Sequence, residues 1–218
     1  MKNFCKNNSL SIVFGLLFLI SLVGQSITGF HEYNKHRSED GQSKISMPAY
    51  LKSGHFVQAT FENWESEFLQ MSLFVLFTIF LRQKGSSESK EVDEPAPVDA
   101  EPSPQRKGAP WPVKKGGLAL AIYKHSLSIA FLILFLFSIA LHFYGSLKDE
   151  NEELLSKHLP AETAGQYLFD SRFWFESFQN WQSEFLSVFC IVLFSVFLRE
   201  QGSPQSKPVD AADYETGD

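Results

Sequence analysis

The chain has 218 residues with a formal net charge of −6 at pH 7, and 22 of its residues are phenylalanine. An acidic chain without a basic patch is not suited to nucleic acid, so we expect no nucleic-acid partner. This phenylalanine content is high for the core of a soluble protein but ordinary for helices that face lipid.

The chain contains an internal repeat, which sets the architecture that we expect. The run Phe-Glu-Asn-Trp-Glu-Ser-Glu-Phe-Leu at residues 61–69 returns as Phe-Gln-Asn-Trp-Gln-Ser-Glu-Phe-Leu at residues 178–186. The shift between the copies is constant, with no insertion or deletion between the matching blocks. We therefore predict two tandem units, residues 1–101 and 118–218, joined by a Pro-rich linker at residues 102–117.

The first helix of each copy follows from an apolar segment of sufficient length. We predict a membrane helix at about residues 8–30, because about 20 residues cross a bilayer. Lys2 and Lys6 before a short apolar region would also fit a signal peptide. The matching segment recurs within the chain, where no signal peptide is expected, so we predict a second retained helix at about residues 119–147.

The second helix of each copy contains the repeated motif. The apolar runs that follow the motif, residues 68–81 and 185–198, are too short to cross a bilayer alone. Each helix must therefore begin before the motif, and we predict helices at about residues 56–83 and 173–200. The expected fold class is all-α, an integral membrane four-helix bundle made of two tandem two-helix repeats in parallel orientation.

The segments outside these helices predict disorder and an orientation. The stretches from about residue 86 and from about residue 202 are rich in Ser, Glu and Pro, which is typical of flexible chain. Lys and Arg gather near the helix ends on the side of the termini, which predicts cytoplasmic termini. Four residues are expected to anchor the helices at the two membrane interfaces: Trp64, Trp181, Arg82 and Arg199.

With these helices, Gly54-His55-Phe56 and the run at residues 61–70 resemble an uncharacterised family of small bacterial multi-pass membrane proteins. That family is described only as a domain of unknown function, with a duplicated two-helix unit. The resemblance covers nearly the whole chain apart from the linker and tail. It implies a bacterial origin and the inner membrane, and it implies no activity.

A polar stripe on the second helix of each copy is the best candidate for a functional site. Its members lie on or beside one helix face, because most are spaced three or four residues apart. They are Asn63, Ser66, Glu67 and Gln70 in the first copy, and Asn180, Ser183, Glu184 and Ser187 in the second. By the repeat, Glu67 and Glu184 would face each other or a shared axis.

The stripe has two interpretations. Ionisable groups within a membrane often serve a proton or cation pathway, which would make the protein a channel, transporter or sensor that uses Glu67 and Glu184. Asn, Ser and Glu also hydrogen-bond helices together, which fits a small structural or interaction protein. We prefer the second interpretation. Glu62 and Glu65 become glutamine in the second copy, so we expect both on a solvated interfacial face.

Other chemistry has little support in the sequence. The two cysteines, Cys5 and Cys190, do not correspond under the repeat, and no histidine is repeated. No histidine has the spacing of a zinc ligand either, so we expect no metal and no cofactor. No catalytic motif is present, and an enzyme would need a polar pocket built from the loops at residues 31–54 and 148–171. The expected partners are the lipid bilayer and an unknown membrane protein or a second copy of the chain.

Overall fold

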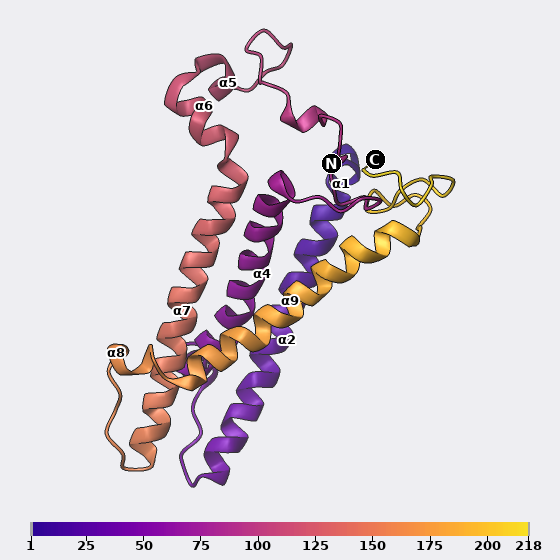
Figure 1. Ribbon diagram of the computed structural model, residues 1–218. Helices are drawn as coiled ribbons and strands as arrows, with labels where there is room; N and C mark the ends of the chain where they lie inside the picture. Colours follow the sequence, from indigo (N-terminus) through magenta and orange to yellow (C-terminus); the bar gives the residue numbers. More distant parts are fainter. Residues whose placement is uncertain (1, 218) are drawn as a thin grey trace. The chain divides into compact units, whose positions relative to one another are not determined.

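The computed structural model describes residues 2–217, and every regular element in that range is helical. Four long helices dominate (Figure 1): α2 (Ser9–Glu39), α4 (Gly54–Phe80), α7 (Ser126–Ser156) and α9 (Ser171–Phe197). The short helices are α1 (Lys2–Asn7), α3 (Met47–Tyr50), η1 (Pro97–Asp99), α5 (Trp111–Lys115), α6 (Gly117–Lys124) and α8 (Ala164–Tyr167). The all-α prediction is therefore confirmed over the described residues.

Three of the helices found in residues 2–217 are long and apolar enough to cross a membrane, namely α2, α7 and α9. This result fits a membrane protein. Helix α4 is not among the three, because Asn63, Glu65 and Glu67 interrupt its apolar residues. A crossing by α4, and with it a bundle of four spanning helices, stays a prediction.

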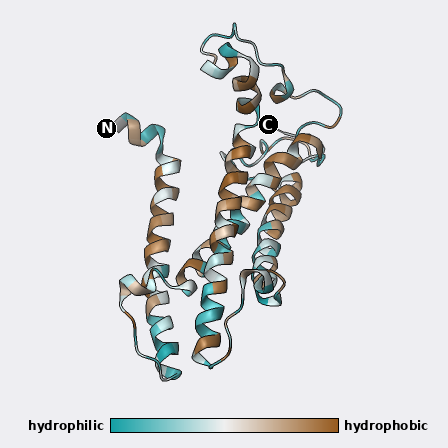
Figure 2. Ribbon diagram, turned by 90° about the vertical axis from the view of Figure 1, so that its left-hand side faces the viewer, coloured by the Kyte–Doolittle hydropathy of each residue, from teal (hydrophilic) through white to brown (hydrophobic). Residues whose placement is uncertain are grey.

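The long helices α2 and α7 extend beyond the ends that we expected at residues 30 and 147. Hydropathy falls there, but the polar residues that follow do not break a helix, and Lys and Glu are good helix formers. Figure 2 shows these hydrophilic stretches at the ends of α2 and α7 that follow the apolar parts. Helix α7 begins 117 residues after α2, and α9 begins 117 residues after α4.

The chain divides into two compact units that do not coincide with the two sequence copies. Unit 1 contains the residues up to Phe61 together with Leu141–Asp170. Unit 2 contains Glu62–Ala140 together with the residues from Ser171 onward. Each unit therefore draws on both copies.

In unit 1, two asparagines fasten the returning loops to their own helices. The Asn34 amide in α2 donates to the carbonyl of Ile45 (3.1 Å) and accepts from its N–H (2.8 Å). The Asn151 amide in α7 binds the carbonyl (3.0 Å) and N–H (2.6 Å) of Glu162 in the same way. A side-chain amide carries both a donor and an acceptor, so it can satisfy both backbone groups of one residue.

Two buried tyrosines complete these attachments in unit 1. Tyr50 in α3 packs its ring near Phe30 and Tyr33, and its hydroxyl lies against α2 at Gly29. Tyr167 in α8 is also buried, and its hydroxyl hydrogen-bonds with Ser146 in α7. Each short helix is thereby held on the long helix that precedes it.

Glycine allows a close backbone approach between the beginning of α4 and the end of α7 in unit 1. A β-carbon on Gly54 would stand 2.3 Å from the Asp149 nitrogen, and one on Gly145 would stand 2.4 Å from the Gln58 nitrogen. Small residues at a helix crossing let the backbones come this close.

Candidate functional site

The repeated motif forms a hydrogen bond between its two copies inside unit 2. Glu65 on α4 has an exposed fraction of 0%, and its Oε1 accepts a hydrogen bond from the Trp181 indole Nε1 on α9 at 3.0 Å. Our expectation that Glu65 is solvated was wrong. The second copy has Gln182 at this position, so the charge is not needed in both copies. That replacement does not tell whether the Glu65 side chain is buried or solvated.

The serines and the second asparagine of the stripe bind the backbone of their own helices. Ser66 donates to the Asn63 carbonyl and Ser183 to the Asn180 carbonyl, each at 2.8 Å. Ser187 donates to the Glu184 carbonyl at 2.8 Å. The Asn180 amide donates to the carbonyl of the residue four positions earlier at 3.0 Å. Such local bonds satisfy polar side chains within an apolar helix without any ligand.

The carboxylates that we expected to be paired differ in their surroundings. Glu67 is exposed and Glu184 is half-buried, and they lie near enough in unit 2 for their charges to repel. Gln70, one turn further along α4, is buried. The stripe is therefore buried in part and open in part, and its role as a site stays a prediction.

The arginines expected as interface anchors close the ends of their helices. The Arg82 Nη1 donates to the carbonyls of Thr78 (3.4 Å), Ile79 (3.1 Å) and Leu81 (2.9 Å) at the end of α4. Helix C-termini leave such carbonyls without an intrahelical partner, and a cationic donor satisfies them. Anchoring in a membrane stays a prediction for these arginines, as it does for Trp64, which is half-buried.

Arg199 ends α9 with the same geometry. Its Nη1 donates to the carbonyls of Ser195 (3.4 Å), Val196 (3.0 Å) and Leu198 (3.0 Å). The shared sequence signal is Leu-Arg-x-x-Gly-Ser-x-x-Ser-Lys, at residues 81–90 and 198–207. We had placed its Leu-Arg at the ends of the predicted helices and had assigned the part from about residues 86 and 202 to flexible chain.

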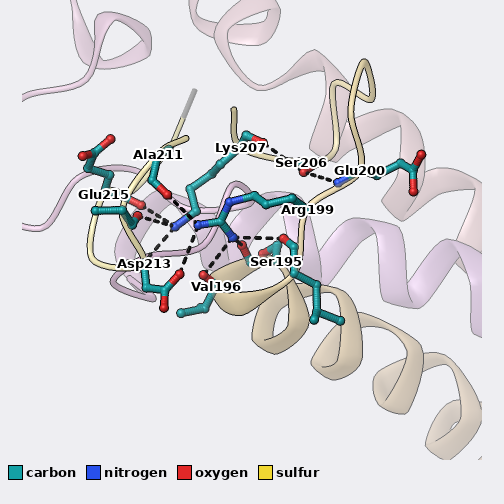
Figure 3. A network of polar contacts seen from close by, with 11 residues as sticks. Ser195, Val196, Arg199, Glu200, Ser206, Lys207, Ala211, Asp213 and Glu215 are labelled. Atoms are coloured by element: carbon teal, nitrogen blue, oxygen red, sulfur yellow. Dashed lines mark hydrogen bonds and ion pairs between the residues drawn. The ribbon is translucent and has the colours of Figure 1, made fainter. Parts of the chain in front are cut away.

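The two caps differ in what surrounds the rest of the guanidinium. The Arg199 Nη2 donates to the Ala211 carbonyl (3.0 Å) and to Asp213 Oδ1 (3.2 Å), as Figure 3 shows. The Lys207 ammonium beside it donates to the carbonyls of Ala212 (3.1 Å), Asp213 (3.2 Å) and Glu215 (2.8 Å). The tail is thereby wrapped around two cations in unit 2.

The tail also binds the segment that follows α4. The Gly85 N–H donates to Thr216 Oγ1 (2.9 Å), and the Gly217 N–H donates to the Ser86 carbonyl (3.0 Å). Ser86 Oγ and Ser195 Oγ share a hydrogen bond of 2.8 Å. These bonds join the end of α4 to the end of α9 within unit 2, in stretches that we expected to be disordered; disorder there stays a prediction.

Unit 1 contains a separate polar cavity of about 550 Å³. Its lining includes Tyr33, Arg37, His55 and Glu152, and the Tyr33 hydroxyl donates to Glu152 Oε2 at 3.2 Å. The lining comes from α2, the beginning of α4 and the end of α7, in part the polar loops that we named as the place for an enzyme pocket. Several of its charges bind within the protein: the Arg37 Nε donates to the Ser43 carbonyl at 2.9 Å, and Lys157 pairs with Glu153.

Comparison with known proteins gives one result. The sequence model of the family DUF6766, described as a domain of unknown function, matches residues 1–218. No curated protein and no solved structure matches the chain.

Proposed function

Because the chain belongs to the DUF6766 family, whose function is unknown, we propose that it is a small structural or interaction protein of the bacterial inner membrane. It crosses the membrane four times as two tandem two-helix units in parallel orientation, and its termini lie in the cytoplasm. Its partners are the lipid bilayer and another membrane protein or a second copy of the chain. The three helices apolar enough to cross a membrane support this proposal.

The observation that carries the proposal is the hydrogen bond between Glu65 and Trp181. Both residues belong to the repeated motif, and the bond uses the buried carboxylate to hold α4 and α9 together. A buried carboxylate that accepts an indole N–H from another helix is engaged in helix packing. The serines of the stripe are engaged in the same way by their own helices.

The test is a set of substitutions at this hydrogen bond. We expect Glu65→Leu and Trp181→Phe each to destabilise the purified protein by on the order of 2 kcal/mol, because each removes this buried hydrogen bond from the polar group that remains. Glu65→Gln keeps an acceptor oxygen and serves as the matched control. Thermal unfolding in detergent measures the effect, and the double variant should be no less stable than the worse single variant.

The interaction role is measured in the same variants. A photo-crosslinker at the exposed Ile20 of α2 should capture a membrane protein or a second copy in living cells, and Glu65→Leu should reduce that adduct. The structural role is contradicted if Glu65→Leu is as stable as the wild type and gives the same amount of adduct.

A second function has one observation in its favour, which is that Glu67 and Glu184 lie near each other in unit 2. Two carboxylates near each other in a membrane would suit a proton or cation pathway. In a chain without Cys5 and Cys190, single cysteines at positions 67 and 184 would be treated with a membrane-impermeant thiol reagent from either side.

A water-filled pathway predicts that both cysteines react while cysteines at the control positions Trp64 and Phe68 stay protected. If positions 67 and 184 react no faster than their neighbours, a pathway along the stripe is untenable.

A further inference from the structure

We propose that a groove between α4 and α9 in unit 2 binds one acyl chain of a phospholipid whose headgroup carries a phosphate and a primary ammonium. The inference rests on the proposed membrane location and extends it by naming a ligand. It is argued from the shape of the groove, from the charges at its end and from a difference between the two copies.

The body of the groove is apolar and narrow. Its walls are mainly Leu73, Phe74 and Phe77 of α4, with Phe185, Val188 and Val192 of α9. Its volume of about 270 Å³ is slightly below the range of roughly 300–1,000 Å³ that is typical of sites for drug-sized molecules. Between Gln70 and Leu81 the groove follows α4 for about 17 Å at about 1.5 Å per residue. A single hydrocarbon chain fits such a space better than a ring system.

The end of the groove beyond Leu81 carries two opposite charges. Arg82 and Glu88 both line it, together with the polar side chains of Gln83 and Ser89. A guanidinium binds a phosphate with charge-assisted hydrogen bonds, and a carboxylate accepts hydrogen bonds from an ammonium. A headgroup with a phosphate and a primary ammonium can bind both side chains, whereas a headgroup without a primary ammonium offers no donor of this kind to Glu88.

The second copy lacks this arrangement, which makes the groove end specific to the first. There, Asp213 accepts from the Nη2 of Arg199, and the residue that matches Asp213 in the first copy is Ala96. The residue that matches Glu88 is Gln205. Arg82 thus uses Nη1 for its helix end, as Arg199 does, while Asp99, the acid near it, forms its ion pair with Lys90.

The experiment measures lipid retention by the full-length protein with native mass spectrometry. The protein in detergent is mixed with phosphatidylethanolamine, phosphatidylcholine or phosphatidylglycerol of identical chains. We expect one phosphatidylethanolamine to be retained about tenfold better than either other lipid, as a charge-assisted hydrogen bond would give. Arg82→Gln should lose this retention about tenfold, while the matched variant Arg199→Gln should stay within about twofold of the wild type.

Two further variants separate the headgroup from the chain. Glu88→Gln should abolish the preference for the primary ammonium over choline, and Glu94→Gln, an exposed acid of the same segment, should not. Val188→Trp should reduce binding of all three lipids by filling the groove, with circular dichroism and thermal unfolding as the check on folding. Equal retention of the three lipids by the wild type, or equal losses in Arg82→Gln and Arg199→Gln, would overturn the proposal.

Extraction of membranes at alkaline pH tests the membrane location separately. If the wild type is released, both the proposed function and the groove proposal fail. If it stays in the membrane and shows no headgroup preference, only the groove proposal fails.

Discussion

Lys207 is the cation whose environment the tail controls most completely. Its side chain is 2% exposed, and three backbone carbonyls accept from its ammonium. Burial, and then the nearby charge of Arg199, lower the pKa of Lys207 below its ordinary value of 10.5. The ammonium therefore holds the tail through its hydrogen bonds, while burial and the charge of Arg199 disfavour its protonated form.

The lowered pKa of Lys207 predicts that the stability of unit 2 depends on pH. Between the lowered pKa and 10.5, the unfolded state binds more protons at Lys207 than the folded state, so the stability contributed by this residue rises with pH in that window. We expect Lys207→Met to lack this rise and to lose on the order of 2 kcal/mol at neutral pH, because three carbonyls lose their donor. Limited proteolysis of the tail as a function of pH measures both effects.

The matched control is Lys90→Met, which removes the equivalent lysine of the first copy and its ion pair with Asp99. That pair is partly exposed, so its loss should change stability much less than the loss of Lys207 does. Equal slopes with pH in the wild type and in Lys207→Met would contradict the role of Lys207.

Single residues also mark the limit of prediction from the sequence. The replacement of Glu65 by glutamine in the second copy led us to expect a solvated acid, whereas Glu65 is buried. Whether a carboxylate is solvated or buried depends on which helix packs against it, and this is a property of the tertiary structure. The caps formed by Arg82 and Arg199 were missed for a similar reason, since an arginine after an apolar run also fits a membrane interface.

At the scale of elements, the long helices were the predictable part. The length of the apolar segments predicted α2 and α7. The apolar runs after the motif are too short to cross a membrane alone, and this predicted that α4 and α9 begin before the motif. The loop attachments were not predicted, because Asn34 and Asn151 are isolated polar residues in the sequence. Their only signal is that both copies carry asparagine at the matching position.

These asparagines predict local effects on the loops of unit 1. We expect Asn34→Ala to speed hydrogen exchange of the Ile45 amide at least tenfold, because a loss of about 1.4 kcal/mol corresponds to that factor. Asn34→Asp keeps the acceptor and loses the donor, so it should protect the Ile45 amide better than alanine does.

Asn151→Ala should act in the same way on the Glu162 amide and leave Ile45 unchanged. Faster exchange of both amides in either single variant would show that the two attachments are not independent.

At the scale of the whole molecule, the two sequence copies and the two compact units divide the chain differently. Unit 1 takes residues up to Phe61 and the stretch Leu141–Asp170, and unit 2 takes the remainder. Two of the three boundaries fall within α4 and α7, and the third falls directly before α9 begins at Ser171. Hydropathy could not predict this division, because it reports apolar length and says nothing about which side chains meet.

The hydrogen bond from Trp181 to Glu65 has a consequence for symmetry. Two identical chains related by a twofold axis would form such a contact twice, since each surface meets its own copy. A chain that carries both motifs can form it once, and here the residue that matches Glu65 is Gln182, which is exposed. Joining the copies in one chain thus permits an unequal pair, in which only one of two equivalent positions has to keep its acid.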